Sequence, residues 1–256
     1  MKKKINEKNK SNGQNKILMI GIMCLIIFVI IGIFCAKIFK NDKSNGELFP
    51  RTDRLRVYRN DDDSVVGWIK VNGTNIDYAV HLGNTNSNND IIWTNDTLAN
   101  GENRKIVLGH NILNVSKKPL VNAKMLTRFE PLMAYVYQDF VQEHLYIQYV
   151  DIDSEESLYK IYAISFYSGD EDVGESYTDE KDITNYIEKV RKASIYDLDV
   201  DVDYQDELIT LATCTRYFGV NGPKHFKIDA RKVRKNEKIS NYSVKKSNNY
   251  DIMNKE

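Results

Sequence analysis

Cysteine is scarce in this sequence, with three residues in 256, and two of them, Cys24 and Cys35, lie inside one long apolar run. Cys214 is the one cysteine of the polar part of the chain, which excludes the disulfide framework typical of small secreted domains. It ends the alternating segment "ELITLATC", and no second cysteine stands nearby. A thiol in this position is either a buried structural side chain or a reactive group.

The sequence also lacks an excess of charge of either sign. Lysine and arginine total 36, and aspartate and glutamate total 36. Because there is neither a basic surplus nor a nucleic-acid-binding motif, we expect no nucleic-acid partner. The acidic run from Asp61 to Asp63 has no further carboxylates at the spacing of a cation-binding loop. It therefore predicts a solvated turn, and we expect no metal site.

Hydrophobic residues form one long run, "ILMIGIMCLIIFVIIGIFCA", over residues 17–36, and its 20 residues are enough for a helix to cross about 30 Å of hydrocarbon. Six lysines precede this predicted transmembrane helix and three follow it before Arg51. This bias places residues 1–16 inside the cell and the rest outside, at the cell membrane. A cleaved signal peptide is less favoured, because its apolar part is usually about 7 to 15 residues long.

The folded part is expected over residues 51–233, after a polar spacer at 37–50. The segment "VVGWIKVNGTNIDYAV", residues 65–80, alternates apolar and polar side chains around Asn72-Gly73, which predicts a β-hairpin. Further strands are predicted at 105–110, 144–151, 158–167, 207–214 and 225–233. Many short strands with few helices are typical of a closed or nearly closed barrel, so the predicted fold is mainly β.

Two helices and a tail complete the prediction. A helix can open the domain just after Arg51, and a second one is predicted over residues 178–196, with Thr178 as its N-cap. Its apolar stripe has helical spacing and consists of Ile183, Tyr186, Ile187 and Val190. Residues 234–256 are rich in lysine, asparagine and serine, and we expect them to be disordered.

A nucleophilic cysteine needs a basic or cationic partner, and the chain offers four histidines. His110 follows the apolar strand "KIVLG" and precedes Asn111, at a strand-to-loop junction of the kind that often carries function. His81 and His144 are expected to be structural. The wide separation of His110 from Cys214 is no obstacle, because Cys–His pairs are adjacent in space rather than in sequence.

Two motifs resemble those of the sortase family. "TLATC", residues 210–214, matches the sortase signature TLxTC, and "LGHN", residues 108–111, resembles the segment that carries the catalytic histidine. They occur in the expected order, each at the end of a predicted strand and downstream of a predicted membrane anchor. The resemblance covers about residues 60–233. The helix before the TLxTC strand is similar to class B in particular, and "GPKHF" makes class D the nearest competitor.

The resemblance implies a closed eight-stranded barrel and a cysteine transpeptidase that uses no cofactor. Cys214 would attack the threonine carbonyl of an LPxTG- or NPxTN-like sorting signal on a surface protein or pilin, forming a thioester. His110 would pass a proton to the leaving amine and accept one from the incoming amine of peptidoglycan or of a pilin lysine. Thr213 and Ala212 would line the substrate groove, and the membrane helix would hold the enzyme beside its substrates.

One position departs from the family pattern. Sortases place an arginine at the start of the last barrel strand to hold substrate and stabilise the oxyanion, whereas this chain has His225 there, with Lys224 beside it. Histidine lacks the permanently charged, five-donor fork of arginine. Arg216 and Arg231 are the other candidates for this role. The departure keeps two alternatives open: an impaired barrel that only binds sorting signals or pilin tails, and a cysteine peptidase that releases its product to water.

Overall fold

The structure is a computed structural model that describes residues 52–83, 92–94, 104–111, 129–152, 156–168, 179–215, 217–219, 221–223 and 225–251. All of these residues belong to one compact unit that spans residues 49–256. The predicted transmembrane helix and spacer lie outside the described residues. Within the described ranges, no helix has the length and hydropathy needed to cross a membrane.

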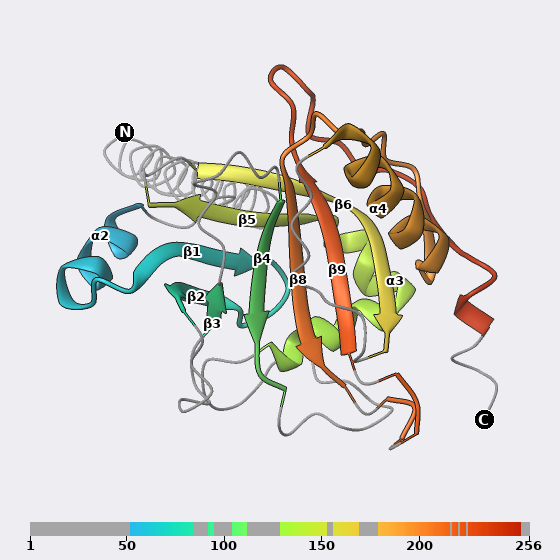
Figure 1. The fold of residues 1–256 in the computed structure, drawn as a ribbon, viewed down its shortest axis with the longest axis horizontal. Coiled ribbons are helices and arrows are strands. Elements are labelled where there is room, and N and C mark those ends of the chain that lie inside the picture. Colours follow the sequence, from blue (N-terminus) through green and yellow to red (C-terminus); the bar gives the residue numbers. More distant parts are fainter. Residues whose placement is uncertain are drawn as a thin grey trace, which may run out of the picture. The chain divides into compact units, whose positions relative to one another are not determined.

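Eight strands close into a barrel in the order β1-β2-β3-β4-β8-β9-β6-β5 (Figure 1). Their bounds are β1 (Val65–Val71), β2 (Asp77–Leu82), β3 (Ile92–Thr94), β4 (Arg104–Gly109), β5 (Tyr146–Asp151), β6 (Glu156–Tyr167), β8 (Leu208–Cys214) and β9 (His225–Lys232). Most neighbours are antiparallel, while β2–β3 and β4–β8 are parallel. The predicted mainly-β barrel is confirmed, and the three-residue strand β3 is the one barrel strand that the sequence did not predict.

The β1–β2 hairpin forms where the sequence predicts it. Val71 and Ile76 bracket the turn through a backbone hydrogen bond, and Gly73 has a φ of +78°, a conformation that favours glycine. A Cβ atom at Gly73 would also lie 2.2 Å from Nε2 of His144. His144 therefore packs directly on the turn, where burial lowers its pKa. This contact agrees with the structural role expected for His144.

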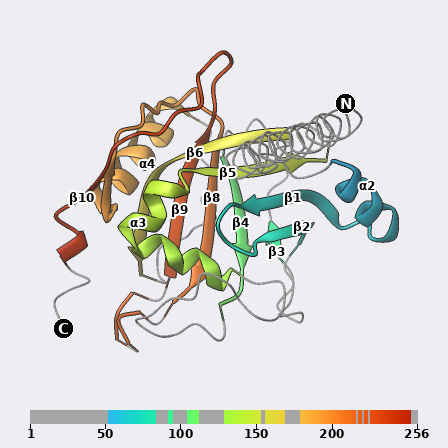
Figure 2. The same ribbon diagram turned by 180° about the vertical axis from the view of Figure 1, so that it is seen from behind.

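The sheet formed by β4, β8, β9 and β6 has two faces of different character. Side chains that point into the barrel are apolar and almost fully buried, namely Val107, Ile209, Leu211, Phe226 and Ile228. Polar side chains occupy the other face, which helix α4 (Glu180–Ala193) covers in part (Figure 2). The hydroxyl of Tyr186 on α4 donates to Asp229 and lies 3.1 Å from Oγ1 of Thr210. The helix is thus fastened to the outer face of strands β8 and β9 by side-chain hydrogen bonds.

Helix α4 confirms the predicted helix but begins two residues later than expected. Its N-cap is Asp179, whose side chain accepts a hydrogen bond of 2.8 Å from the backbone N–H of Asp182. The predicted cap, Thr178, lies outside the described residues. The predicted apolar stripe is buried, with Ile183, Tyr186, Ile187 and Val190 each at most 7% exposed.

The remaining elements flank the barrel. Helix α2 (Thr52–Asp61) confirms the opening helix, while η2 (Glu130–Val136), α3 (Gln138–Glu143), β7 (Tyr196–Leu198) and β10 (Val244–Lys246) were not predicted. The expectation of a disordered tail from residue 234 was wrong over residues 234–251. There β10 pairs with β7, and the hydroxyl of Tyr242 donates to the backbone carbonyls of Leu145 and Ile161. A few well-placed aromatic and apolar side chains order a segment whose average composition is polar.

Candidate active site

Three strand ends bring together the residues that the sequence singled out. Cys214, the last residue of β8, lies directly opposite His225, the first residue of β9, in the antiparallel ladder. Side chains in such pairs have Cβ atoms about 4.5–5.5 Å apart. On the other side, Leu108 of β4 pairs with Ala212 in parallel register. His110 and Cys214 each lie two residues further along, so that His110 directly follows the end of β4 while Cys214 is the last residue of β8.

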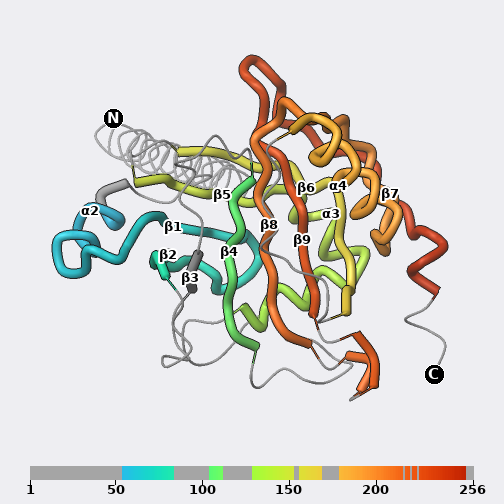
Figure 3. Tube along the Cα trace, in the orientation of Figure 1, coloured from blue at the N-terminus to red at the C-terminus, as the bar shows by residue number. Residues whose placement is uncertain are grey.

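The strand register therefore brings Cys214 and His225 to one edge of the sheet, and His110 directly follows the neighbouring strand β4 at that edge. Figure 3 shows β4 and β8 running to the same lower edge, where β9 begins. Cys214 takes part in no disulfide and is exposed, while His110 and His225 are partly buried. A thiol that a substrate can reach, flanked by two imidazoles, is an arrangement suited to nucleophilic catalysis.

Thr213 fastens β8 to β4 beside the site. Its side chain is 4% exposed and points away from Cys214 because successive residues of a strand alternate between faces. The hydroxyl donates a 2.7 Å hydrogen bond to the carbonyl of Gly109, the residue before His110. Thr213 therefore positions His110 relative to Cys214, and its side chain does not line the predicted groove. Ala212 shares the face of Cys214 but is 1% exposed, so it offers little surface to a substrate.

An aromatic ring holds the imidazole of His225. Tyr167, the last residue of β6, pairs with His225 across the β6–β9 ladder. Their rings are stacked, with centroids 5.0 Å apart and an interplanar angle of 23°. Because His225 has Cys214 on one neighbouring strand and Tyr167 on the other, its ring is fixed next to the thiol.

Aromatic side chains pack the described part of the connection between β8 and β9 onto β6. Thr215 accepts a 3.1 Å hydrogen bond from the backbone N–H of Tyr217, which turns the chain immediately after the nucleophile. The rings of Tyr217 and Phe218 then pack on Phe166, with centroids 5.5 and 4.8 Å away. This packing sets the geometry of the segment that joins Cys214 to His225. Arg216 and Lys224 lie outside the described residues, so their predicted candidacy remains a prediction.

His81 and His144 lie elsewhere. Nδ1 of His81, on β2, is 2.9 Å from Oγ of Ser64 and 3.3 Å from Oδ2 of Asp62. These contacts join the two ends of the first hairpin, and β3 and β4 separate β2 from β8 in the barrel order. In the part of the chain that the structure describes, no three His, Cys, Asp or Glu side chains are grouped to hold a metal ion.

The sequence was compared with protein families and with individual known proteins. No family model matches the sequence. Sortase B of Staphylococcus aureus (strain NCTC 8325 / PS 47) is 26% identical over 160 residues, which are 59% of this chain and 63% of that protein. Sortase B of Listeria monocytogenes serovar 1/2a is 26% identical over 190 residues, 66% of this chain and 69% of that protein. The match thus spans less than two thirds of the length of the first relative.

The fold agrees with these matches. The Staphylococcus aureus sortase B–substrate complex superposes with a TM-score of 0.58 at 19% identity, covering 78% of this chain and 92% of that structure. Sortase B from Listeria monocytogenes gives 0.55 at 23% identity, covering 69% and 99%. The chain is similar in sequence and in fold to class B sortases. The barrel is therefore sortase-like, and the predicted resemblance to class B is confirmed.

Arg231 cannot serve this sortase homologue as the arginine of the active site. It lies six residues beyond His225 on β9, about 20 Å along the strand at 3.3 Å per residue. Its guanidinium is 2% exposed and forms two hydrogen bonds with the carboxylate of Glu237, of 2.6 and 2.9 Å. The sequence prediction that kept Arg231 as a candidate was therefore wrong, because strand direction carries the residue to the far end of the barrel.

The sequence analysis missed a set of buried polar side chains next to the site. Strict alternation in "HFKIDARK" puts His225, Lys227, Asp229 and Arg231 on one face of β9, which the period-two pattern already indicated. Asp229 is fully buried and accepts hydrogen bonds from Tyr186 and from Oγ1 of Thr210. Burial, and then the charge of Asp229, raise the pKa of Tyr186 well above its ordinary value. Tyr186 is consequently a protonated donor at every physiological pH.

Proposed function

We propose that this chain is an active cysteine transpeptidase of the class B sortase type. The observation that carries the proposal is the placement of Cys214 between His110 and His225 on three adjacent strand ends. Homology to sortase B proteins supports a sortase transpeptidase, and the accessible thiol supplies the nucleophile.

The proposed reaction runs in two half-reactions. The Cys214 thiolate attacks the carbonyl carbon of the threonine in a sorting signal, and the C–N bond that follows this threonine breaks. His110 gives a proton to the leaving amine, and the acyl group remains on sulfur as a thioester. An acceptor amine then attacks the thioester, His110 takes a proton from it, and the new amide bond releases the thiolate.

His225 is proposed as the donor to the oxyanion that forms in each half-reaction. It is the residue directly opposite Cys214, and its stack on Tyr167 fixes its direction. Preorganised donors of this kind usually contribute about 10²- to 10³-fold to the rate. Histidine donates from both ring nitrogens only when protonated, so this role depends on pH where an arginine would not.

The substrates proposed are an LPxTG- or NPxTN-like peptide and an amine of peptidoglycan or of a pilin lysine. Support comes from homologues whose structures include a substrate complex and a complex with triglycine, a peptide that carries a free amine. The proposed location is the outer face of the cell membrane, held by the helix of residues 17–36. The apolar length of this run and the lysines before it support that location.

The test uses the full chain in detergent micelles with a fluorogenic sorting peptide, with and without triglycine as acceptor. Ligation that needs both the acceptor and Cys214 is the expected result. Hydrolysis without ligation would instead identify a peptidase. Binding of the peptide without turnover would identify a signal-binding barrel, the second candidate, which the histidine in place of the family arginine favours.

A further inference from the structure

A lysine lies immediately behind the proposed active site. Lys227 follows His225 by two residues on the same face of β9, and it pairs directly with Ala212, which precedes Cys214 by two residues on β8. Diagonal neighbours in such a ladder have Cβ atoms about 7–8 Å apart or less, within reach of a long side chain. The lysine therefore shares the outer face of the sheet with both the thiol and His225.

The environment holds the ammonium of Lys227 in place with aromatic rings. The residue is 7% exposed, and its Nζ atom lies 5.4 Å from the ring centroid of Tyr167 and 5.2 Å from that of Tyr186. Cation–π contacts of this kind attract an ammonium group to the faces of aromatic rings. Tyr167 is also the ring on which His225 stacks, so one aromatic side chain contacts both cationic candidates.

The carboxylate beside Lys227 neutralises it only in part. Oδ2 of Asp229 lies 3.9 Å from Nζ, beyond hydrogen-bonding distance, while Oδ1 accepts hydrogen bonds from Tyr186 and Thr210. Within the described residues, Lys227 Nζ makes no hydrogen bond. The guanidinium of Arg104 lies over the other side of this cluster, 4.4 Å from the ring centroid of Tyr186. Arg104 is thus a second cationic side chain in contact with Tyr186.

We propose that Lys227 supplies the permanent positive charge of this active site, stabilising the Cys214 thiolate and the developing oxyanion from behind His225. The inference rests on the proposed transpeptidase function. It assigns the electrostatic part of the missing arginine's role to Lys227 and leaves the directional hydrogen bond to His225. A positive charge about 7–8 Å from a thiol in a partly buried site raises the thiolate population by about tenfold or more.

The thiol itself reports on this charge without any substrate. The rate of Cys214 alkylation by iodoacetamide, measured against pH in the full chain, follows the thiolate fraction. The other titratable groups near this region are left unchanged, namely His110 just after β4, His225 and Asp229 on β9, Tyr167 on β6 and Tyr186 on α4. We expect Lys227→Met to slow alkylation about tenfold at pH 7 and to move the midpoint of the profile to higher pH, while Lys227→Arg retains the wild-type profile.

The matched control is Lys232→Met, which removes one positive charge from the same strand. Lys232 lies five residues further along β9, paired with Glu207 at 3.2 Å, so its loss is expected to leave the profile unchanged. Equal alkylation profiles for wild type and Lys227→Met would overturn the inference, and so would an equal shift in Lys232→Met. If Lys227→Met fails to fold by circular dichroism, Lys227→Gln, which also removes the positive charge but keeps a polar side chain, is used in its place and is read in the same way.

Activity separates this inference from the proposed function. If the wild-type chain ligates peptide to triglycine, Lys227→Met is expected to lower kcat/KM about 10- to 100-fold, with Lys227→Arg restoring most of it. Unchanged kcat/KM in Lys227→Met would overturn the assignment while leaving the transpeptidase intact. If the wild type does not ligate, the proposed function fails, and the alkylation profile still decides whether Lys227 activates the thiol.

Discussion

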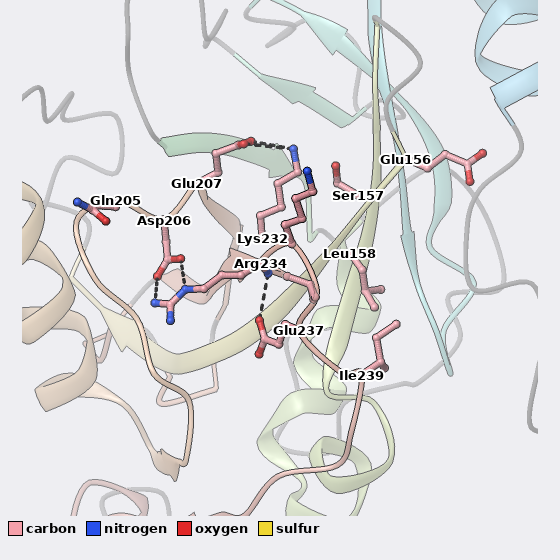
Figure 4. Close-up of a pocket in the computed structure, with 12 residues that line it drawn as sticks. Glu156, Ser157, Leu158, Gln205, Asp206, Glu207, Lys232, Arg234, Glu237 and Ile239 are labelled. Carbon is pink, nitrogen blue, oxygen red and sulfur yellow. Dashed lines mark hydrogen bonds and ion pairs between the residues drawn. The ribbon is translucent and has the colours of Figure 1, made fainter.

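The β8–β9 ladder has two ends that use ionisable side chains in opposite ways. At one end, the exposed Cys214 faces His225. At the other end, Arg231 faces Leu208 and its guanidinium is committed to Glu237, to the carbonyl of Asp201 and to that of Lys232. Figure 4 shows this second end, a cavity of about 640 Å³ in which acidic and basic side chains pair with one another.

The contrast shows how one pair of strands separates stability from chemistry. At the Arg231 end, Arg234 alone bonds to three carboxylates, those of Asp201, Asp203 and Asp206. Permanent charges matched in this way fix the strands but leave few donors for a ligand. At the Cys214 end, the side chains are a thiol and imidazoles, the kinds of group that exchange protons in catalysis. Strand β9 thus contains a buried arginine, Arg231, but at the end of the strand remote from Cys214.

The largest effect is expected from the catalytic end. Cys214→Ala removes the nucleophile and should lower ligation at least about 10⁴-fold, and His110→Ala should lower it about 10³-fold. Cys214→Ala should change the free energy of unfolding by at most about 0.5 kcal/mol because Cys214 is exposed. His110→Ala should change it somewhat more. Ligation rates and urea unfolding on the same preparations check this. Ligation activity that survives Cys214→Ala would show that the Cys214 end of the ladder is not the catalytic end.

Replacing His225 should sharpen the comparison. His225→Ala is expected to cost about 10²-fold in kcat/KM because the oxyanion loses its nearest donor. His225→Arg supplies a donor that stays charged, so its activity should exceed that of the wild type above pH 8 and not below pH 6. A pH–rate profile of the three proteins makes the test. If His225→Ala and the wild type have the same profile, His225 is not the oxyanion donor.

The structural end should respond in stability rather than in rate. Hydrogen bonds from Arg231, the main cause, lower the pKa of Glu237 from 4.5 to about 2. Because the folded-state pKa is depressed, this carboxylate stabilises the fold above about pH 4.5 and loses that contribution as pH falls toward 2. Glu237→Gln should therefore cost about 2 kcal/mol at pH 7, and its difference from wild type should shrink in acid.

The control for that experiment is ligation by Glu237→Gln at 25 °C, which should equal the wild-type rate within about twofold, as expected for a substitution distant from the reacting atoms. Urea unfolding at pH 7, 4.5 and 3 gives the stability difference. A constant difference across this range would show that the Arg231–Glu237 pair does not act as described.

The smallest effect concerns helix α4, which contacts the middle of β9 through Tyr186. Asp179→Ala removes the side-chain cap of the helix and should cost about 1 kcal/mol, while Asp179→Ser should cost less because serine caps almost as well. Thermal unfolding of the two variants compares them. Equal stability of Asp179→Ala and the wild type would contradict the cap.

The sequence predicted the parts of the fold that have a local cause. Alternation and the Asn72-Gly73 turn placed the first hairpin, and the stripe from Ile183 to Val190 placed α4. Strands β3, β7 and β10 were missed because three residues carry too little pattern. The order after residue 234 was missed because it depends on single side chains such as Tyr242, which lock onto strands far away in the sequence.

Sequence motifs named the candidate residues, whereas their arrangement could be described only from the strand pairing. The motifs pointed to Cys214 and His110, and His225 was named from its place in the last strand. Thr213 was misjudged because alternation turns its side chain to the opposite face. Lys227 was overlooked because a buried lysine has no sequence signature until the strand pairing shows what lies beside it.

The most direct test of the account is the intact mass of the full chain after brief reaction with a sorting peptide in the absence of an amine acceptor. The account predicts an adduct equal to the acyl portion of the peptide, mapped to Cys214 and released by hydroxylamine, and absent from Cys214→Ala. Peptide cleavage with no adduct on wild type, and at an equal rate in Cys214→Ala, would contradict it.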